Sequence, residues 1–128
     1  MAKLDLFGLV VKDMATSLNF YRLLGMEIPA EMDSEGHVEV MLPGGLRLAW
    51  DSLDVIMSFS DEWETPAGHR IGLAFLCDSP AEVDRLYEAV IAAGYEGHKR
   101  PWDAFWGQRY AQVKDPDDNV VDLFAPLP

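Results

Sequence analysis

The sequence predicts an α+β fold in which a βαβββ arrangement occurs twice along one domain, residues 1–128. Three observations support this prediction. Each half of the chain opens with an apolar, strand-like run that leads directly into a helical pattern of apolar residues. Each half then continues with three short strand-like runs bounded by turn-forming residues. The length of 128 residues suits a single domain with a substantial core.

The first repeat is predicted over residues 1–52. The apolar run Leu4–Val11 predicts its first strand. A helix is predicted next, because Asp13 is a favourable N-cap and Gly25 suits the end of a helix. Apolar residues recur at helical spacing between them: Met14, Leu18, Tyr21 and Leu24. Three strands are predicted to follow, with a PGG hairpin turn between the last two: Met26–Ala30, Val38–Leu42 and Leu46–Asp51.

The second repeat is predicted over residues 69–128, after a polar linker at 53–68 with room for one short helix. It opens with the apolar run Arg70–Cys77. Pro80 suits the first position of a helix, and Gly94 suits its end. The buried face of this helix is predicted from its spacing: Val83, Leu86, Tyr87, Val90 and Ile91. The three strands predicted after it are Tyr95–Trp102, Gly107–Lys114 and Asn119–Phe124.

The charge balance limits the partners that the chain can have. Its 22 acidic and 10 basic residues give a formal net charge of −12. Such a chain repels nucleic acid and anionic membranes, so neither is predicted as a partner. It has no apolar run long enough to span a bilayer, and its N-terminus, MAKLDLFG, lacks the features of a secretory signal. With a single cysteine and therefore no intrachain disulfide, the expected location is the cytoplasm.

An internal duplication of this kind predicts where a ligand would bind. Each repeat forms a sheet that its own helix covers on one face only, and the other face needs a different cover. Two such sheets side by side would form a curved surface with a groove. A groove of this kind is the expected binding place for a small molecule.

Two stretches of the sequence resemble a known superfamily. "GLVVKDMATSLNFYRLLGMEI" and "PWDAFWGQRYAQVKDPDDNVVDLFAP" resemble the vicinal oxygen chelate superfamily, which includes glyoxalase I, extradiol dioxygenases, fosfomycin-modifying enzymes and bleomycin-resistance proteins. The pairing of the helix end FYRLLG with the turn DPDDN before the last strand is specific. Within the superfamily, the likeness is greatest to resistance proteins that bind mitomycin or bleomycin. The resemblance implies paired βαβββ modules in curved mixed sheets, a homodimer and a pocket on the concave sheet face.

The resemblance also implies where a metal ion would bind in metal-dependent members. Their ligands come from concave positions of the strands, and of these positions only Asp122 carries a suitable side chain here. Leu6, Arg47 and Arg70 occupy the others, and arginine has no lone pair to give to a metal ion. His69 neighbours Arg70 and is expected to point to the opposite face of the strand. We therefore predict no metal, no cofactor and no catalytic residue.

Asp122 is unusual because it interrupts a run of β-branched and apolar residues. By the alternation of a strand, Val120, Asp122 and Phe124 share one face, which is expected to be the pocket face. A buried carboxylate needs a partner. That partner is either the ligand or an arginine, the candidates being Arg47, Arg70 and Arg109.

Aromatic residues are concentrated in the stretch PWDAFWGQRY. Flat rings stack on conjugated ligands, so Trp106 and Tyr110 are predicted to line the binding site of a planar molecule, whereas Trp102 is expected in the core or a dimer interface. Trp106 and His37 are predicted to face each other across the ligand. The full set of predicted ligand-binding residues is His37, Trp50, Trp106, Tyr110, Gln112, Asp122 and Phe124.

Together these patterns predict a cytoplasmic, homodimeric binding protein that sequesters a planar drug, which can be cationic, of the mitomycin or bleomycin type. Two alternatives stay open. One is a metal-dependent lyase, isomerase or dioxygenase of the same fold, in which His37, His69 and Asp122 converge. The other is a module that binds a metabolite.

Overall fold

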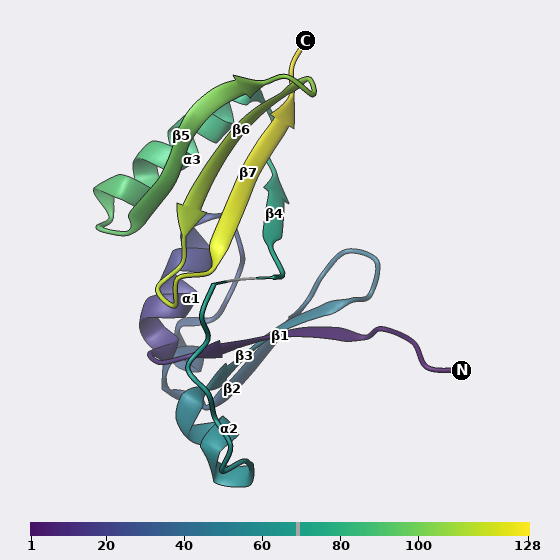
Figure 1. Cartoon of the computed structure of the whole chain (residues 1–128), viewed down its shortest axis with the longest axis vertical. Helices are drawn as coiled ribbons and strands as arrows, with labels where there is room; N and C mark the ends of the chain where they lie inside the picture. The colour runs from purple at the N-terminus through teal and green to yellow at the C-terminus, as the bar shows by residue number, and fades with distance from the viewer. Residues whose placement is uncertain (69) are drawn as a thin grey trace. The chain divides into compact units, whose positions relative to one another are not determined.

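The computed structural model of the chain describes residues 1–68 and 70–128, which form an α+β fold with two mixed sheets (Figure 1). The elements are β1 (Leu6–Val11), α1 (Met14–Leu23), the 3-10 helix η1 (Ala30–Ser34), β2 (His37–Met41), β3 (Arg47–Ser52), α2 (Leu53–Phe59), β4 (Leu73–Leu76), α3 (Pro80–Ala92), β5 (Glu96–Ala104), β6 (Gln108–Lys114) and β7 (Val120–Pro126). No helix in the described part of the chain is long and apolar enough to cross a membrane. The chain divides into two compact units, Met1–Asn19 with Glu27–Thr65 and Phe20–Met26 with Pro66–Pro128.

The first unit contains a three-stranded sheet in the order β1-β3-β2. β1 runs parallel to β3, and β2 runs antiparallel to it. Val38, Leu48 and Trp50 are buried on one face of this sheet. The predicted hairpin turn between β2 and β3 is confirmed: the Leu42 amide donates to the Leu46 carbonyl at 2.7 Å, across glycines with positive φ.

One predicted strand of the first half is wrong. Residues 26–29 form a loop that leads into η1, so the described part of this half has three strands instead of four. Pro29 has no amide to donate to a strand partner, and its φ of −56° suits the entry to η1. The predicted linker does contain a short helix, α2, where the Ser52 hydroxyl accepts a hydrogen bond from the Val55 amide at 3.2 Å.

The second unit contains a four-stranded sheet in the order β4-β7-β6-β5, with β4 and β7 parallel and the other pairs antiparallel. Helix α3 lies against one face of this sheet (Figure 1). It begins as predicted, with Pro80 in its first turn and the Ser79 hydroxyl accepting from the Glu82 amide at 3.2 Å. The residues of β6 and β7 on the side of α3 are aliphatic and fully buried: Ala111, Val113, Val121, Leu123 and Ala125.

The turn between β6 and β7 is built around Asp115, a carboxylate that is only 3% exposed. One oxygen accepts hydrogen bonds from the amides of Asp117 and Asn119, both at 2.9 Å. The other accepts from the Tyr21 hydroxyl at 2.7 Å and from Nδ2 of Asn119 at 2.8 Å. Burial, and secondarily the charge of Asp115, raise the pKa of Tyr21, which keeps its hydroxyl a donor. All four of these donors are neutral groups, and together they stabilise the buried carboxylate through hydrogen bonds.

Removing the Tyr21 hydroxyl tests this network. We expect Tyr21→Phe to lower the free energy of unfolding by about 1–3 kcal/mol, because a buried carboxylate loses one of its donors. Urea unfolding followed by circular dichroism measures the change. Tyr87→Phe on α3 is the matched control, since the Tyr87 hydroxyl makes no side-chain hydrogen bond within residues 1–68 and 70–128. Equal losses in the two variants would contradict the role given to Asp115.

Candidate ligand-binding site

The face of the second sheet that points away from α3 carries two neighbouring rows of side chains. Strand register places an aromatic row across it, which we define as Trp102, Tyr110, Phe124 and Leu76. The adjacent row is shifted from the aromatic row by two residues along β6 and β7. We call it the polar row, and its residues are Lys99, Gln112, Asp122 and Ala74. We call this surface the open face. It is partly accessible, since the Leu76 side chain is 68% exposed.

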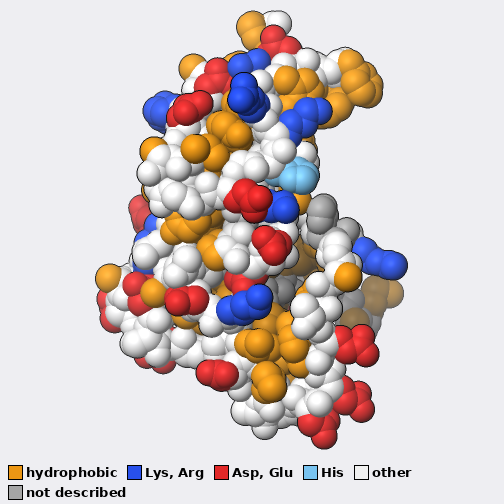
Figure 2. All heavy atoms as spheres, turned by 60° about the vertical axis from the view of Figure 1, so that its left-hand side comes forward, with side chains coloured by type: hydrophobic (Ala, Val, Ile, Leu, Met, Phe, Trp, Pro, Cys, Tyr) orange, Lys and Arg blue, Asp and Glu red, His pale blue; other side chains and the backbone are white. Residues whose placement is uncertain are grey.

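The rings of the aromatic row contact one another and a further ring from the turn after β5. The Tyr110 ring lies 5.4 Å from Trp102, 5.3 Å from Trp106 and 6.1 Å from Phe124, measured between centroids. Trp106 belongs to the β5–β6 turn and not to a strand, but its Nε1 donates to Oε1 of Gln108 at 2.8 Å, which fixes the ring beside the row. Figure 2 shows hydrophobic side chains at the upper end of the molecule, where β5 turns into β6 in Figure 1.

Asp122 lies on the open face, and its partners are neutral side chains. The Tyr110 hydroxyl donates to Oδ2 of Asp122, and Nε2 of Gln112 donates to Oδ1 at 2.9 Å. Burial, followed by the hydrogen bond to Asp122, raises the pKa of Tyr110 to about 12. Within residues 1–68 and 70–128, the carboxylate is therefore held in place by two neutral donors from the neighbouring strand.

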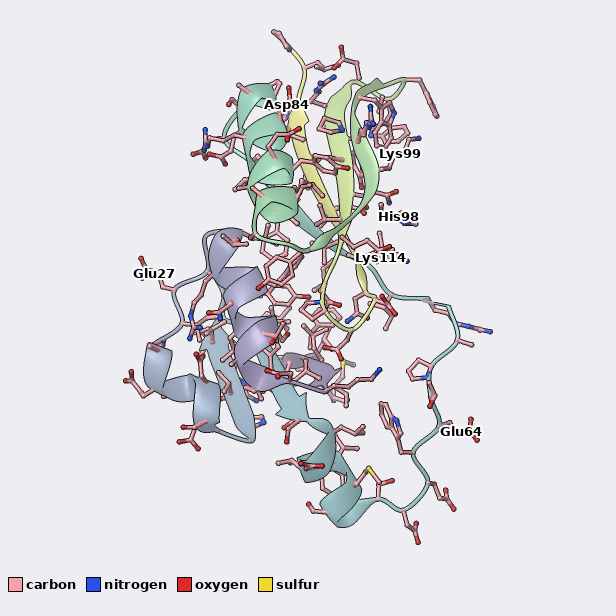
Figure 3. The ribbon with its side chains drawn as sticks, turned by 90° about the vertical axis from the view of Figure 1, so that its left-hand side faces the viewer. Glu27, Glu64, Asp84, His98, Lys99 and Lys114 are labelled. Atoms are coloured by element: carbon pink, nitrogen blue, oxygen red, sulfur yellow. The ribbon has the colours of Figure 1, made fainter. Side chains whose placement is uncertain are left out.

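The predicted arginine partner of Asp122 is wrong. Arg109 points to the other side of the sheet, where it bonds Asp84 of α3 at 2.9 Å and Asp103 at 3.1 Å. Arg47 bonds carboxylates of the first unit, and Arg70 lies exposed before β4. Figure 3 shows Asp84 on α3 and Lys99 on the opposite side of the sheet. The strand alternation around position 109 explains why this arginine cannot reach the open face.

Lys99 is the cation nearest to the aromatic row. Its Nζ lies 3.9 Å from the centroid of the Trp102 ring, in cation–π contact. Sequence reasoning missed both residues. Trp102 was expected in the core or a dimer interface, but it is only half-buried. Strand alternation does not predict the face of the sheet on which Lys99 lies, because β5 contains register shifts between Gly97 and Lys99 and between Lys99 and Trp102.

Two of the predicted site residues lie on the first sheet. Trp50 is fully buried in β3, so its ring is part of the core. His37 is exposed at the start of β2, with Nδ1 2.5 Å from Oδ1 of Asp51 and Nε2 3.0 Å from Oε2 of Glu39. The hydrogen bonds to Glu39 and then Asp51 raise the pKa of His37. Arg47 joins this cluster through Oε1 of Glu39 at 2.9 Å.

The other predicted residues are brought together on the open face: Trp106, Tyr110, Gln112, Asp122 and Phe124. They come from β6, β7 and the turn that precedes β6, so their mutual placement depends on one pair of strands. The predicted pairing of Trp106 with His37 concerns residues of different units, and it stays a prediction.

In the part of the chain that the structure describes, the side chains that could donate to a metal ion do not converge on one point. Within residues 1–68 and 70–128, no group of three or more His, Cys, Asp or Glu side chains converges in a way that could hold one. Both oxygens of Asp122 accept bonds from Tyr110 and Gln112, and both ring nitrogens of His37 face carboxylates. His69, which the enzyme alternative requires, lies outside the described residues. The described side chains at the expected ligand positions do not fit a divalent metal ion.

Comparison with known protein families identifies the superfamily to which the chain belongs. A sequence profile of the Glyoxalase/Bleomycin resistance protein/Dioxygenase superfamily matches residues 3–123. The chain belongs to this superfamily. The resemblance seen in the helix end and the DPDDN turn is therefore confirmed, and so is the fold that the resemblance implies.

Solved structures share the fold of the chain. A family enzyme from Burkholderia phytofirmans PsJN superposes with a TM-score of 0.80 at 22% identity, covering 98% of this chain and 100% of that one. A glyoxalase/bleomycin resistance protein/dioxygenase from Nocardioides gives 0.69 at 25% identity, covering 99% and 85%. Hypothetical protein SA1046 from S. aureus gives 0.78 at 20% identity, covering 98% and 94%. Among curated proteins, none matches this superfamily member.

The His37 cluster makes a pH-dependent contribution to stability. The raised pKa of His37 means that the folded chain keeps a proton that the unfolded chain releases near its ordinary value of 6.5. The contribution is thus fully present below that value and is lost as the pH rises through the folded pKa.

We expect the difference in Tm between wild type and His37→Gln to be larger at about pH 5.5 than at about pH 9. Differential scanning calorimetry at both pH values measures it. His98→Gln, at an exposed histidine of β5, controls for the loss of an imidazole far from these carboxylates along the chain. A difference that grows toward high pH would contradict the assignment.

Proposed function

We propose that this superfamily member binds a planar aromatic small molecule on the open face and holds it without transforming it. The proposed ligand is a drug of the mitomycin or bleomycin type, so that binding alone would give resistance by sequestration. The observation that carries the proposal is the set of contacting rings, Trp102, Trp106, Tyr110 and Phe124, directly beside the carboxylate of Asp122.

The exposure of these rings supports a binding role. Trp106 is 48% exposed and its neighbour Phe105 is 96% exposed, although both are large and apolar. Burying such surface against a flat ligand is favourable, and stacked aromatic pairs add about 0.5–1.5 kcal/mol beyond the buried area. Asp122 adds an acceptor at a fixed position, because Tyr110 and Gln112 hold its two oxygens. Rings for affinity and one oriented polar group for selectivity are the usual composition of a small-molecule site.

We propose further that the site works without a metal ion and that the chain acts as a homodimer, as the superfamily resemblance implies. The metal-free proposal is supported by the side chains themselves. Leu6 and Arg47 at two expected ligand positions offer no lone pair to a cation. The carboxylate at a third position, Asp122, already accepts two hydrogen bonds.

Trp106 provides the direct test of the ring site. We expect mitomycin C or bleomycin to quench tryptophan fluorescence, and Trp106→Ala to weaken binding by roughly 1–3 kcal/mol, the scale of a lost aromatic anchor. Isothermal titration calorimetry measures the affinity independently of fluorescence. Trp63→Ala is the matched control, because Trp63 is also partly exposed but lies outside both sheets. Equal affinity in wild type and Trp106→Ala would remove Trp106 from the site.

Metal content separates sequestration from the enzyme alternative. We expect elemental analysis of protein purified without chelator to show far less than one zinc, nickel, iron or manganese ion per chain. We also expect a chelator to leave the affinity for the drug unchanged, because no step of binding passes through a cation. One tightly bound ion per chain would instead favour a lyase, isomerase or dioxygenase in which His37, His69 and Asp122 converge.

A further inference from the structure

We propose that the ligand of the open face is bipolar: a planar ring system with an acceptor or anionic group at the edge facing Lys99 and an N–H donor at the edge facing Asp122. This inference rests on the proposed function, because it concerns the same surface. The sequence allows a planar ligand that can be cationic, whereas this inference requires an acceptor and a donor at opposite ends. It also assigns Lys99 as a residue that determines specificity.

The polar row and the aromatic row lie side by side on the open face. In the polar row, Lys99 of β5 is paired with Gln112 of β6, and Gln112 is paired with Asp122 of β7. Neighbouring strands lie about 4.8 Å apart, so the backbones of Lys99 and Asp122 are separated by about 10 Å across the sheet. The aromatic row runs parallel to this line. A ring system of two fused rings placed on the aromatic row would therefore have opposite charges near its two ends.

Lys99 determines what one end of the ligand can carry. Its ammonium has three donors and no acceptor. Nζ lies over the Trp102 ring, and within the described residues Lys99 has no carboxylate partner. A ring that stacks on Tyr110 would bring its β5-side edge next to this ammonium. A carbonyl or carboxylate there would gain a charge-assisted hydrogen bond, whereas a cationic group would be repelled.

Asp122 determines what the other end can carry. A carboxylate only accepts hydrogen bonds, and each of its oxygens has room for more than one donor. Each oxygen has one donor from the protein, Tyr110 or Gln112. An amine or amide N–H at the β7-side edge of the ligand would complete the set. Because the two neighbouring side chains hold the carboxylate in position, the donor must approach from the open side of the sheet.

Four naphthalenes with matched shape test the inference. 6-Amino-2-naphthoic acid carries a donor and an acceptor at opposite ends, 2-naphthoic acid carries only the acceptor, 2-aminonaphthalene carries only the donor, and naphthalene carries neither. Isothermal titration calorimetry of each probe with the full chain gives the affinities. We expect the bipolar probe to bind most tightly, by roughly tenfold or more over either singly substituted probe, the scale of one charge-assisted hydrogen bond.

Two variants test which protein residue contacts each end of the ligand. Lys99→Met should weaken both naphthoic acids roughly tenfold and leave 2-aminonaphthalene unweakened. Asp122→Asn should weaken both amino-substituted probes and leave 2-naphthoic acid unweakened. Lys114→Met is the matched control for charge, because Lys114 lies on β6 two residues beyond Gln112 and farther from the aromatic row. Figure 3 labels both lysines.

The outcomes separate this inference from the proposed function. Equal affinity for all four probes, with binding weakened by Trp106→Ala, would leave the ring site standing and overturn the bipolar ligand. Tightest binding of 2-aminonaphthalene, improved by Lys99→Met, would also overturn it and identify a ligand that needs only a donor group. Absence of binding by all four, naphthalene included, would overturn both proposals, because stacking alone should hold the bare ring.

Discussion

A single buried carboxylate occupies the turn that joins the two central strands of the second sheet. Asp115 occupies the turn between β6 and β7, and four hydrogen bonds saturate its two oxygens. The turn sets the register in which Tyr110 lies beside Phe124 and Gln112 beside Asp122. In a strand pair, a slip of one residue moves every side chain of the slipped strand to the opposite face. The register joined by this turn is therefore the one that places Tyr110, Gln112, Asp122 and Phe124 together on the open face.

The same carboxylate connects the site to the helix α1. Tyr21 donates to Asp115 from the part of α1 that belongs to the second unit. The helix end and the DPDDN turn are also the motifs that carry the superfamily resemblance. Their joint occurrence in the sequence thus has a physical basis, since the hydroxyl of one motif satisfies the carboxylate of the other.

Secondary structure is predictable from the sequence where a single periodicity of apolar residues continues through an element. The strands β6 and β7 and the helix α3 were predicted within a few residues, because alternation and helical spacing are undisturbed there. The segment near Met26 failed, because its apolar residues resemble a strand but Pro29 cannot take part in one.

The site was predicted less completely than the fold. Alternation places Asp122 on the face opposite Val121 and Leu123, as the structure has it, but the partners predicted for it are the ligand or an arginine and not Tyr110 and Gln112. The preference of a half-buried carboxylate for Tyr110 and Gln112 depends on the register of two strands that are distant in the sequence, which alternation within one strand does not reveal. Lys99 is not predicted as a site residue for a related reason. Bulges in β5 interrupt the alternation of side chains from which its orientation would be predicted.

The alternation of buried and partly exposed side chains along Tyr110–Lys114 of β6 and Val121–Ala125 of β7 has an evolutionary consequence. The residues that pack against α3, such as Val113 and Leu123, are fully buried, and the residues of the open face, such as Gln112 and Phe124, are not. Under the proposed function, selection for stability acts on one set of positions, and selection for a particular ligand acts on the set between them. A lineage can change the molecules that it recognises through substitutions that leave its core intact. A scaffold with this division can diversify in small steps, each of which still folds.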